Sequence, residues 1–201
     1  MTSPGGRPLR VATRNPGKLR EFVEILAPLG YDVRGVDDLS AFQVEEDGDT
    51  FAANALKKAE TLMRLTGEPA VADDSGLVVD ALGGAPGIHS ARYAGVAPPD
   101  HDAANRAKLV AALAAVPAAA RTARFVCAIA YCAPGCRPVT CNGALEGQIN
   151  TEERGGQGFG YDPLFVPVGE TRTLAEISSD EKHRISHRGQ ALRALALRLA
   201  E

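Results

Sequence analysis

The stretch Arg7-Pro-Leu-Arg-Val-Ala-Thr-Arg-Asn-Pro-Gly-Lys18 joins an apolar run to the start of a helix, and it decides the fold class. Residues 7–13 are typical of a strand. The apolar positions that follow, as far as Leu29, recur at helical spacing and predict a helix over 16–29. Asn15 suits the N-cap of that helix and Pro16 suits its first turn. A strand that turns directly into a helix favours an α/β fold.

The rest of the chain continues this alternation of strands and helices. Further strands are predicted at 31–36, 69–72, 76–79 (a new strand or a continuation), 124–132 and 138–147. Further helices are predicted at 51–66, 101–116 and 187–199. The last two strands are expected to form a hairpin. The pattern predicts a mixed sheet covered by helices, in one continuous domain over residues 1–201, either undivided or bilobed.

The composition excludes several classes of protein. The chain has 201 residues, with 25 acidic and 22 basic side chains and a formal net charge of −3. It contains no basic run of the kind that holds nucleic acid, and no apolar stretch of the roughly 20 residues that a membrane span needs. The first residues, Met1–Gly6, lack the apolar core of a signal peptide. We therefore expect a cytoplasmic protein that binds neither nucleic acid nor membrane.

The cysteines are interpreted as structural. Their positions are Cys127, Cys132, Cys136 and Cys141, five, four and five positions apart. Metal sites built from cysteine usually contain closely spaced pairs, which this pattern lacks. Because the cysteines flank the turn of the predicted hairpin, we expect small buried thiols without disulfides.

The turn Thr13–Lys18 is a candidate phosphate-binding site. A helix N-terminus presents unpaired N–H groups and a partial positive charge, and Lys18 adds a full charge. Gly17 would let a ligand approach the backbone. The segment is not a Walker A loop, because Leu19 stands where that loop has Ser or Thr. An ordinary capped helix with a solvated lysine is the alternative interpretation.

Acidic residues are concentrated in two places. Glu45-Glu-Asp-Gly-Asp49 precedes a predicted helix that carries Asn54 and Lys58 on one face, with Lys57 expected in solvent. Asp73-Asp-Ser75 follows an apolar strand, where carboxylates are costly unless they bind a metal, join a hydrogen-bond network or act as a base. Helix capping and solvation would explain the first group, and an Asx-turn that closes the strand would explain the second.

A glycine-rich segment, Gly155–Pro163, carries the aromatic residues Phe159 and Tyr161. Its glycines would let the backbone pass close to a ligand, and an aromatic ring can stack on a nucleobase. The alternative is a loop held in place by these rings packing into the core.

The segment Ser178–Gly189 opens with the pattern of a capping box, Ser178 and Glu181. It then brings three basic or titratable side chains to the start of the last helix: Lys182, His187 and Arg188. Isolated cations are usually solvated, but this grouping favours recognition of an anion or a base.

Together these segments resemble the inosine triphosphate pyrophosphatase family, which hydrolyses non-standard purine nucleoside triphosphates. The motifs that carry the resemblance follow one another along the chain as Thr13–Lys18, Phe51–Ala59, Ala72–Leu77, Gly83–Ile88, Ser90–Tyr93, Gly158–Pro163, and Lys182 with Ile185–Gly189. Arg14 departs from the pattern, because the family usually has glycine there. The resemblance implies a long, curved mixed sheet with helical lobes on either side of a central cleft, and a homodimer.

The resemblance also implies roles for individual residues. The phosphates would be held by Thr13, Arg14, Asn15, Pro16, Gly17 and Lys18, with further charge from Lys58. Asp74 would be the general base and, with Glu46, would hold Mg²⁺, Glu45 and Asp47 being adjacent candidates for the second ligand. Ser75 would touch the substrate. The base and sugar would be bound by Phe159, Gly160, Tyr161, Asp162, Lys182, His187 and Arg188.

These roles imply a hydrolysis that cleanses the nucleotide pool. Water would attack the α-phosphorus of ITP, dITP or XTP, releasing pyrophosphate and the nucleoside monophosphate, once lysines, a helix N-terminus and Mg²⁺ neutralise the triphosphate. A pocket that donates to a 6-keto group rejects adenine, because its donors would be left unpaired. Two alternatives are a pyrophosphatase for pyrimidine triphosphates and a nucleotide-binding sensor without catalysis.

Overall fold

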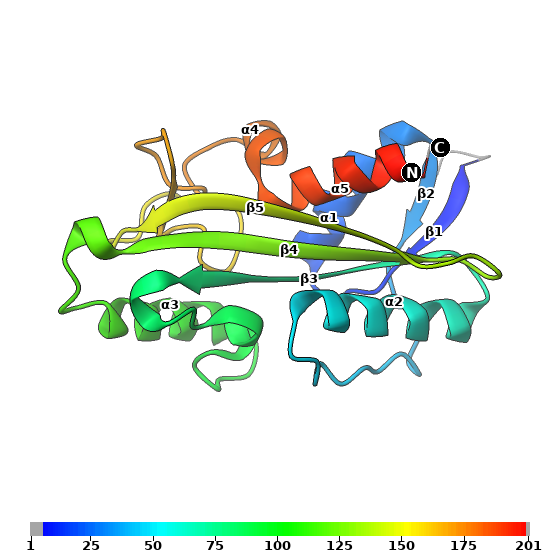
Figure 1. The fold of residues 1–201 in the computed structure, drawn as a ribbon, viewed down its shortest axis with the longest axis horizontal. Coiled ribbons are helices and arrows are strands. Elements are labelled where there is room, and N and C mark those ends of the chain that lie inside the picture. Colours follow the sequence, from blue (N-terminus) through cyan, green and yellow to red (C-terminus); the bar gives the residue numbers. More distant parts are fainter. Residues whose placement is uncertain (1–5, 200–201) are drawn as a thin grey trace. The chain divides into compact units, whose positions relative to one another are not determined.

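The computed structural model describes residues 6–199. The prediction that the first residues lack the apolar core of a signal peptide therefore concerns residues that lie, except for Gly6, outside the described part of the chain. The strands (Figure 1) are β1 (Arg7–Val11), β2 (Tyr31–Arg34), β3 (Ala70–Val79), β4 (Thr122–Cys132), β5 (Val139–Ile149) and β6 (Phe165–Pro167). The α-helices are α1 (Pro16–Leu26), α2 (Phe51–Thr66), α3 (His101–Ala112), α4 (Ser179–Ile185) and α5 (His187–Arg198). Within residues 6–199, no helix combines the length and apolar character needed to cross a membrane.

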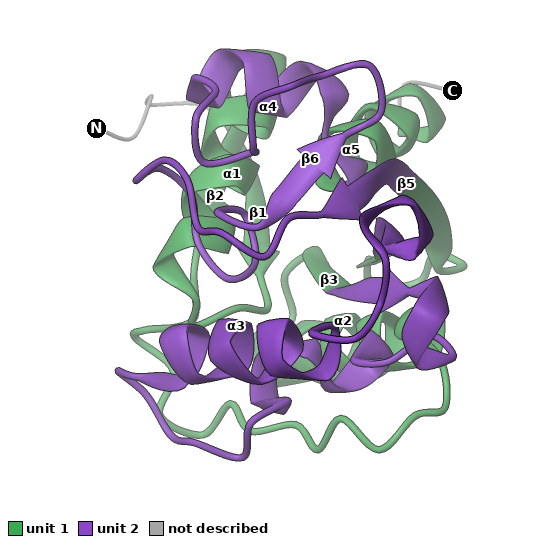
Figure 2. Ribbon diagram, turned by 90° about the vertical axis from the view of Figure 1, so that its left-hand side faces the viewer, with its two compact units in different colours: residues 1–74, 127–143, 188–201 green, residues 75–126, 144–187 purple. Residues whose placement is uncertain are grey.

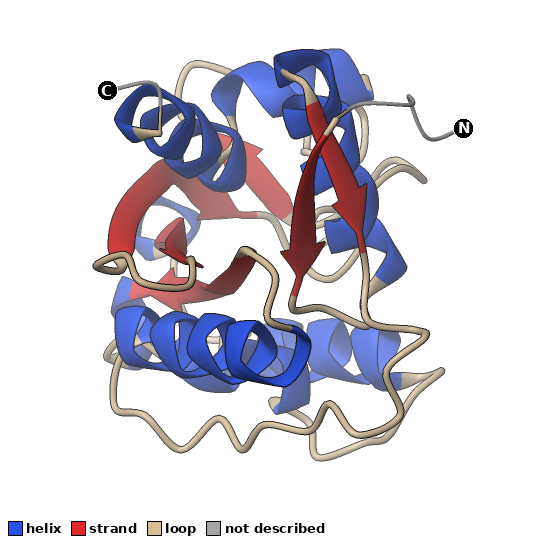
Figure 3. Ribbon diagram, turned by 90° about the vertical axis from the view of Figure 1, so that its right-hand side faces the viewer, coloured by secondary structure: helices blue, strands red, loops and turns tan. Residues whose placement is uncertain are grey.

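The strands form a mixed sheet in the order β2-β1-β3-β4-β5-β6. Strand β1 pairs in parallel with both β2 and β3, whereas β5 and β6 are antiparallel. The predicted mixed α/β sheet with helices is therefore confirmed, as is the predicted adjacency of the two strands of the hairpin. Residues 35–50, between β2 and α2, contain neither helix nor strand and belong to the tan loops of Figure 3.

The chain divides into two compact units (Figure 2). Unit 1 comprises residues 1–74, 127–143 and 188–201, and unit 2 comprises residues 75–126 and 144–187. Strands β3, β4 and β5 each contribute residues to both units. Each unit has a hydrophobic core of its own.

In unit 1, helices cover both faces of the strands. Residues of α1 and α5, including Phe22 and Leu195, pack with Val71 of β3. On the other face, Ala55 and other residues of α2 pack with Ala72 of β3 and with alanines of β4. Because successive strand residues point to opposite faces, neighbouring positions of β3 enter different clusters. The small residues on the α2 side let this helix lie close to the strands.

In unit 2, the core is built around α3 and the second half of β3. Leu109 and Leu113 of α3 pack with Leu77 of β3 and with residues of β4 and β6. The rings of Phe125 and Phe165 lie 4.7 Å apart between centroids and are tilted by 52°. Tilted aromatic pairs of this kind add to the stability that their burial supplies.

Strand β3 decides between two predicted alternatives. The sequence leaves open whether 76–79 is a new strand after a turn at Asp73-Asp-Ser75 or a continuation of 69–72, and β3 runs without interruption through all three residues, as a continuation. The reason is that both carboxylates find partners while the backbone stays extended. Asp73 pairs with Lys18 and Arg188, and Asp74 accepts from Asn54. Because side chains from other elements pair with both carboxylates, no Asx-turn is needed at these residues.

Several other elements are shorter than predicted, among them β1, which ends at Val11 instead of 13. Helix α1 ends at Leu26 and continues as a 3₁₀ turn, because Pro28 has no N–H and cannot continue an α-helix. Helix α3 ends at Ala112 rather than 116, since the N–H groups of Ala114 and Val116 bond to carbonyls three residues back, which tightens the last turn. Strand β2 ends at Arg34 instead of 36.

Candidate active site

The turn between β1 and α1 has the predicted capped geometry. The side chain of Asn15 accepts a hydrogen bond from the Lys18 N–H at 3.0 Å, and Pro16 occupies the first helical turn. The Thr13 hydroxyl accepts from the Asn15 N–H at 3.1 Å. Asn15 is thus confirmed as the N-cap, and the half-buried Gly17 lies in the first turn of the helix.

Arg14 points its guanidinium at backbone carbonyls. Its Nη2 donates to the carbonyl of Leu39 at 3.2 Å and to that of Phe42 at 3.1 Å. These carbonyls belong to the loop between β2 and α2. The arginine therefore ties the turn between β1 and α1 to this loop, a contact that glycine at the same position could not make.

Lys58 lies between two carboxylates. Its Nζ is 2.7 Å from Oε1 of Glu46 and 3.6 Å from Oδ1 of Asp74, and its side chain is 9% exposed. Glu45 and Asp47 are exposed. Of the three adjacent candidates, Glu46 is therefore the carboxylate that faces Asp74 through a shared cation.

Asn54 completes this group from one turn earlier on α2. Its Nδ2 donates to Oδ2 of Asp74 at 3.0 Å, and its Oδ1 accepts from the Gly48 N–H at 2.8 Å. As predicted, Asn54 and Lys58 share one face of the helix, while Lys57 is exposed and pairs with Asp47 at 2.6 Å.

Burial and neighbouring charges act in opposite directions on the pKa values of Asp74 and Lys58. Burial raises the pKa of Asp74 above the ordinary aspartate value, although Lys58 and Asn54 act in the opposite direction. Burial lowers the pKa of Lys58, but the carboxylates of Asp73, Asp74 and Glu46 outweigh it and raise that pKa. An aspartate with a raised pKa is a stronger proton acceptor, held beside a lysine that stays charged.

Arg188 lies in a buried ion-pair cluster. It is 2% exposed, and its Nη2 lies 3.0 Å from Oδ2 of Asp73, while its Nη1 pairs with Glu21 of α1. Lys18 also reaches Oδ2 of Asp73, at 3.0 Å. Burial lowers the pKa of Arg188, but Asp73 and Glu21 more than reverse this and raise it. The sequence analysis did not identify Glu21 as part of this cluster. Glu21 lies three residues after Lys18, and this spacing, which places both on one face of the helix, could have indicated that they belong together.

In unit 2, the glycine-rich segment is joined to α4. Lys182 Nζ is 2.7 Å from Oδ2 of Asp162, and both side chains are buried. The same oxygen accepts from the Phe159 N–H at 2.9 Å, and Lys182 Nζ lies 4.9 Å from the centre of the Phe159 ring. At Gly158 a Cβ would come within 2.1 Å of that oxygen, so only glycine fits there.

The remaining predicted residues of unit 2 are also placed. Tyr161 is buried, and its hydroxyl donates to the Ser90 carbonyl at 2.8 Å, so this ring packs in the core as the alternative interpretation held. His187 is buried and stacks on Phe125, with ring centroids 4.8 Å apart and planes 10° from parallel. Ser75 is half-buried in β3.

The predicted site residues thus fall into two groups. Those of unit 1 are Thr13, Arg14, Asn15, Pro16, Gly17, Lys18, Glu46, Lys58, Asp74 and Arg188. Those of unit 2 are Ser75, Phe159, Gly160, Tyr161, Asp162, Lys182 and His187. Of the residues predicted to bind the base, Lys182 pairs with Asp162 of unit 2, and Arg188 pairs with Asp73 of unit 1. The unit 1 group contains cations and carboxylates among its side chains, and the unit 2 group combines aromatic side chains with the buried ion pair of Lys182 and Asp162.

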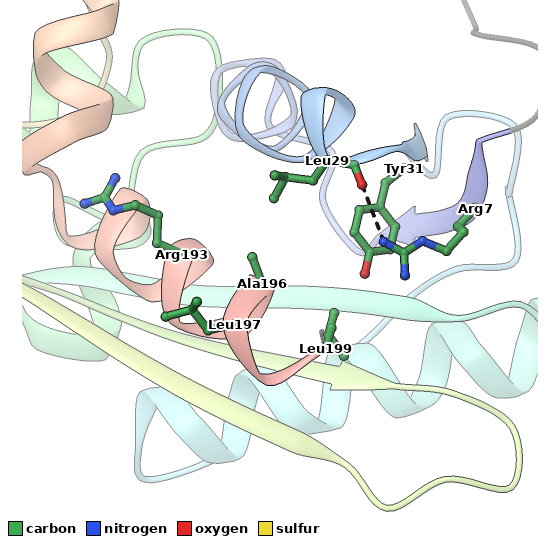
Figure 4. A pocket seen from close by; sticks show the side chains of 7 residues that line it. All are labelled: Arg7, Leu29, Tyr31, Arg193, Ala196, Leu197 and Leu199. Carbon is green, nitrogen blue, oxygen red and sulfur yellow. Dashed lines mark hydrogen bonds between the residues drawn. The ribbon is translucent and has the colours of Figure 1, made fainter. Parts of the chain in front are cut away.

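Unit 1 also contains a pocket of about 490 Å³ that includes none of these residues. Figure 4 shows its lining, which is Arg7, Leu29, Tyr31, Arg193, Ala196, Leu197 and Leu199. Arg7 lies 4.4 Å above the Tyr31 ring. The described lining residues are apolar side chains together with two arginines and a tyrosine.

Known proteins share this fold and much of the sequence. The model of the Ham1 family matches residues 9–197. The chain is 50% identical over 187 residues to a dITP/XTP pyrophosphatase of Bacillus licheniformis, covering 92% of this chain and 94% of that protein. The Staphylococcus aureus Ham1 protein aligns with a TM-score of 0.84 at 39% identity, covering 96% of this chain and 98% of that one.

A further solved structure is that of a nucleoside-triphosphatase / dITP/XTP pyrophosphatase from Mycobacterium abscessus. It aligns with a TM-score of 0.75 at 44% identity and covers 94% of this chain and 98% of that one. The resemblance drawn from the sequence motifs is thereby confirmed, and the chain belongs to the Ham1 family.

Proposed function

We propose that this protein hydrolyses dITP, ITP and XTP to the nucleoside monophosphate and pyrophosphate in a Mg²⁺-dependent reaction. Its place in the Ham1 family and its 50% identity to a dITP/XTP pyrophosphatase make it a nucleoside triphosphate pyrophosphatase. The proposal adds the metal, the inclusion of ITP, the point of attack and the roles of individual residues.

The observation that carries the proposal is the arrangement around Asp74. This carboxylate is 5% exposed, accepts from Asn54 at 3.0 Å and lies 3.6 Å from the ammonium of Lys58. A buried carboxylate with a raised pKa suits a general base that removes a proton from water. The hydrogen bond from Asn54 to Oδ2 of Asp74 orients the carboxylate.

The carboxylates of Glu46 and Asp74 fit Mg²⁺. Both face one cation, the Lys58 ammonium, and both are hard oxygen donors of the kind that Mg²⁺ prefers. Within residues 6–199, no three His, Cys, Asp or Glu side chains are grouped to hold a metal. Mg²⁺ is commonly held by one or two carboxylates together with substrate phosphates, so two suffice. When bound, it would neutralise phosphate charge and polarise a phosphoryl oxygen.

The phosphates are assigned to the turn between β1 and α1. Its N–H groups and the helix dipole favour anions, and Lys18 and Lys58 add positive charge. Lys18 is already oriented by Asp73, at 3.0 Å, which keeps its side chain beside the turn. With the negative charge of the triphosphate reduced, water deprotonated by Asp74 can attack the α-phosphorus.

The base and sugar are assigned to the residues of unit 2. The Phe159 ring offers a stacking platform, and Lys182 offers a donor for a 6-keto group. The buried pair of Lys182 and Asp162 holds the donor in a fixed direction. Adenine has a donor at the same position, so it would leave this group unpaired. We further propose that the protein acts as a cytoplasmic homodimer on small-molecule substrates alone.

The test is a panel of triphosphates: dITP, ITP, XTP, dATP, dGTP, dTTP and dUTP. Pyrophosphate and nucleoside monophosphate are quantified with Mg²⁺ and with a chelator, and light scattering gives the oligomeric state. In water enriched in heavy oxygen, the label should appear in the monophosphate, because the α-phosphorus is attacked. A preference for dTTP or dUTP, or label in the pyrophosphate, would contradict the proposal.

A further inference from the structure

Helix α3 holds both backbone groups of Gly160. Oδ2 of Asp102 accepts from the Gly160 N–H at 2.9 Å, and Nη1 of Arg106 donates to the Gly160 carbonyl at 3.0 Å. Asp102 and Arg106 are four residues apart, so they project from the same face of the helix. The two side chains therefore fix the orientation of the peptide groups on both sides of one residue.

This glycine is constrained by its backbone rather than by crowding. Gly160 has φ +61°, and a Cβ at this position would meet nothing within 4 Å. Both the N–H and the C=O of Gly160 bond to side chains of α3. The hydrogen bonds from α3 are therefore the contacts that orient the two peptide groups of Gly160.

The neighbours of Gly160 are the groups assigned to the base. Phe159 precedes it and lies near the Lys182 ammonium, at 4.9 Å, and Asp162 accepts from both the Phe159 N–H and Lys182. A rotation of the Gly160 peptide would turn the Phe159 ring and shift the Asp162 carboxylate that orients Lys182. Arg106 also pairs with Glu153 at 2.9 Å, which holds its guanidinium in place.

We infer that Asp102 and Arg106 are positioning residues that determine base selectivity, through their hydrogen bonds to the backbone of Gly160. This inference rests on the proposed function, because it assigns Phe159 and Lys182 to the base. Neither side chain needs to touch the substrate. Loss of either would let the segment 158–162 sample several orientations, so that its donors could adapt to adenine as well as to a 6-keto purine.

The test compares Asp102→Ala with Asp102→Asn. For Asp102→Ala, KM for dITP should rise by about 3–10-fold with kcat nearly unchanged, as expected for one hydrogen bond of ground-state positioning. The ratio of kcat/KM for dITP to that for dATP should fall by a similar factor. Asp102→Asn should restore both values, because its carboxamide oxygen can still accept from the Gly160 N–H.

Lys108→Ala is the matched control. Lys108 lies on the same helix, where its ammonium donates to the Tyr93 carbonyl at 2.6 Å and lies 4.4 Å from the centre of the Tyr93 ring. Its removal should leave the dITP-to-dATP ratio unchanged. If Asp102→Ala is poorly folded, Arg106→Met provides the second variant, with the same expected fall in the ratio.

The possible results separate the two proposals. A wild-type protein that releases no pyrophosphate from dITP would contradict the proposed function. An active wild-type protein whose Asp102→Ala and Arg106→Met variants melt at lower temperature, but keep the wild-type ratio, would overturn the positioning role alone. A fall in the ratio for Lys108→Ala equal to that for Asp102→Ala would overturn it too.

Discussion

Arg188 donates two hydrogen bonds to a single oxygen of Asp73, from Nε at 3.2 Å and from Nη2 at 3.0 Å. Its other end pairs with Glu21, and Lys18 reaches the same Asp73 oxygen. Two cations and two carboxylates thus form a group with no net charge, which joins α1, β3 and α5. Such a group is costly to bury, and removal of one member leaves the others with uncompensated charge.

The first prediction concerns Arg188→Ala. The substitution leaves two buried carboxylates without their shared guanidinium, so the free energy of unfolding should fall by about 3–5 kcal/mol. Arg193→Ala, at an exposed position of the same helix, should cost no more than about 0.5 kcal/mol. Urea titrations of both variants measure the difference. Equal losses would show that the buried cluster does not stabilise the fold.

The second prediction uses adjacent lysines of α2. Lys58→Met removes the cation between Glu46 and Asp74, and kcat/KM for dITP should fall by about 10²–10³-fold because phosphate charge is no longer neutralised. Lys57→Met removes a lysine whose side chain is 43% exposed, and the rate should stay within about twofold of wild type. Steady-state assays of pyrophosphate release compare them. Similar rates for both variants would rule out the assigned role of Lys58.

The third prediction concerns Asp74→Asn. Loss of the general base should lower kcat by about 10²–10⁴-fold while nucleotide binding is retained. Because burial raises the pKa of Asp74, its charged form is disfavoured in the folded protein, and the neutral variant should be no less stable than wild type. Calorimetric melting with a chelator present tests the stability, and titration calorimetry tests binding. A variant that turns over at the wild-type rate would show that another group is the base.

The fourth prediction concerns the thiols. Burial, with a smaller contribution from Glu60, raises the pKa of Cys132 to about 11, so near neutral pH its thiolate fraction is far below that of an ordinary cysteine. Cys136 is exposed. A chromogenic disulfide reagent should therefore modify Cys136 first and Cys132 only after unfolding or at high pH. Cys136→Ser should remove the fast phase, and a fast phase that persists would contradict this order.

The sequence predicts helices and strands well where nearby residues mark their ends. Thr50 caps α2 and Gly67 ends it in the left-handed region with φ +69°, so both ends match the prediction. Strand β3 was predicted less well, because Asp73 and Asp74 are strand breakers unless distant side chains satisfy them. Their partners Arg188 and Asn54 lie 115 and 20 residues away, and no local pattern reveals such pairs.

The candidate site shows the same division. Asn15 and Lys18 were found from the capped turn, and Asn54 and Lys58 from helical spacing. Glu21, Asp102 and Arg106 were missed, because each acts on a residue remote in the sequence and none belongs to a recognisable motif. Arg188 was assigned to the base from its neighbours along the chain, and only its burial between two carboxylates identifies Asp73 and Glu21 as its partners.

The discontinuous course of unit 1 has a consequence for protein synthesis. Its core joins Leu9 and Val11, made first, to Ala191, Leu192 and Leu195, made last. The core on the α1 side of β1 therefore cannot close while the chain is still growing on the ribosome, and the early strands must wait with apolar surface exposed. A premature stop codon before residue 191 would remove Ala191, Leu192 and Leu195 from this core, so that even a nearly full-length product should fail to fold.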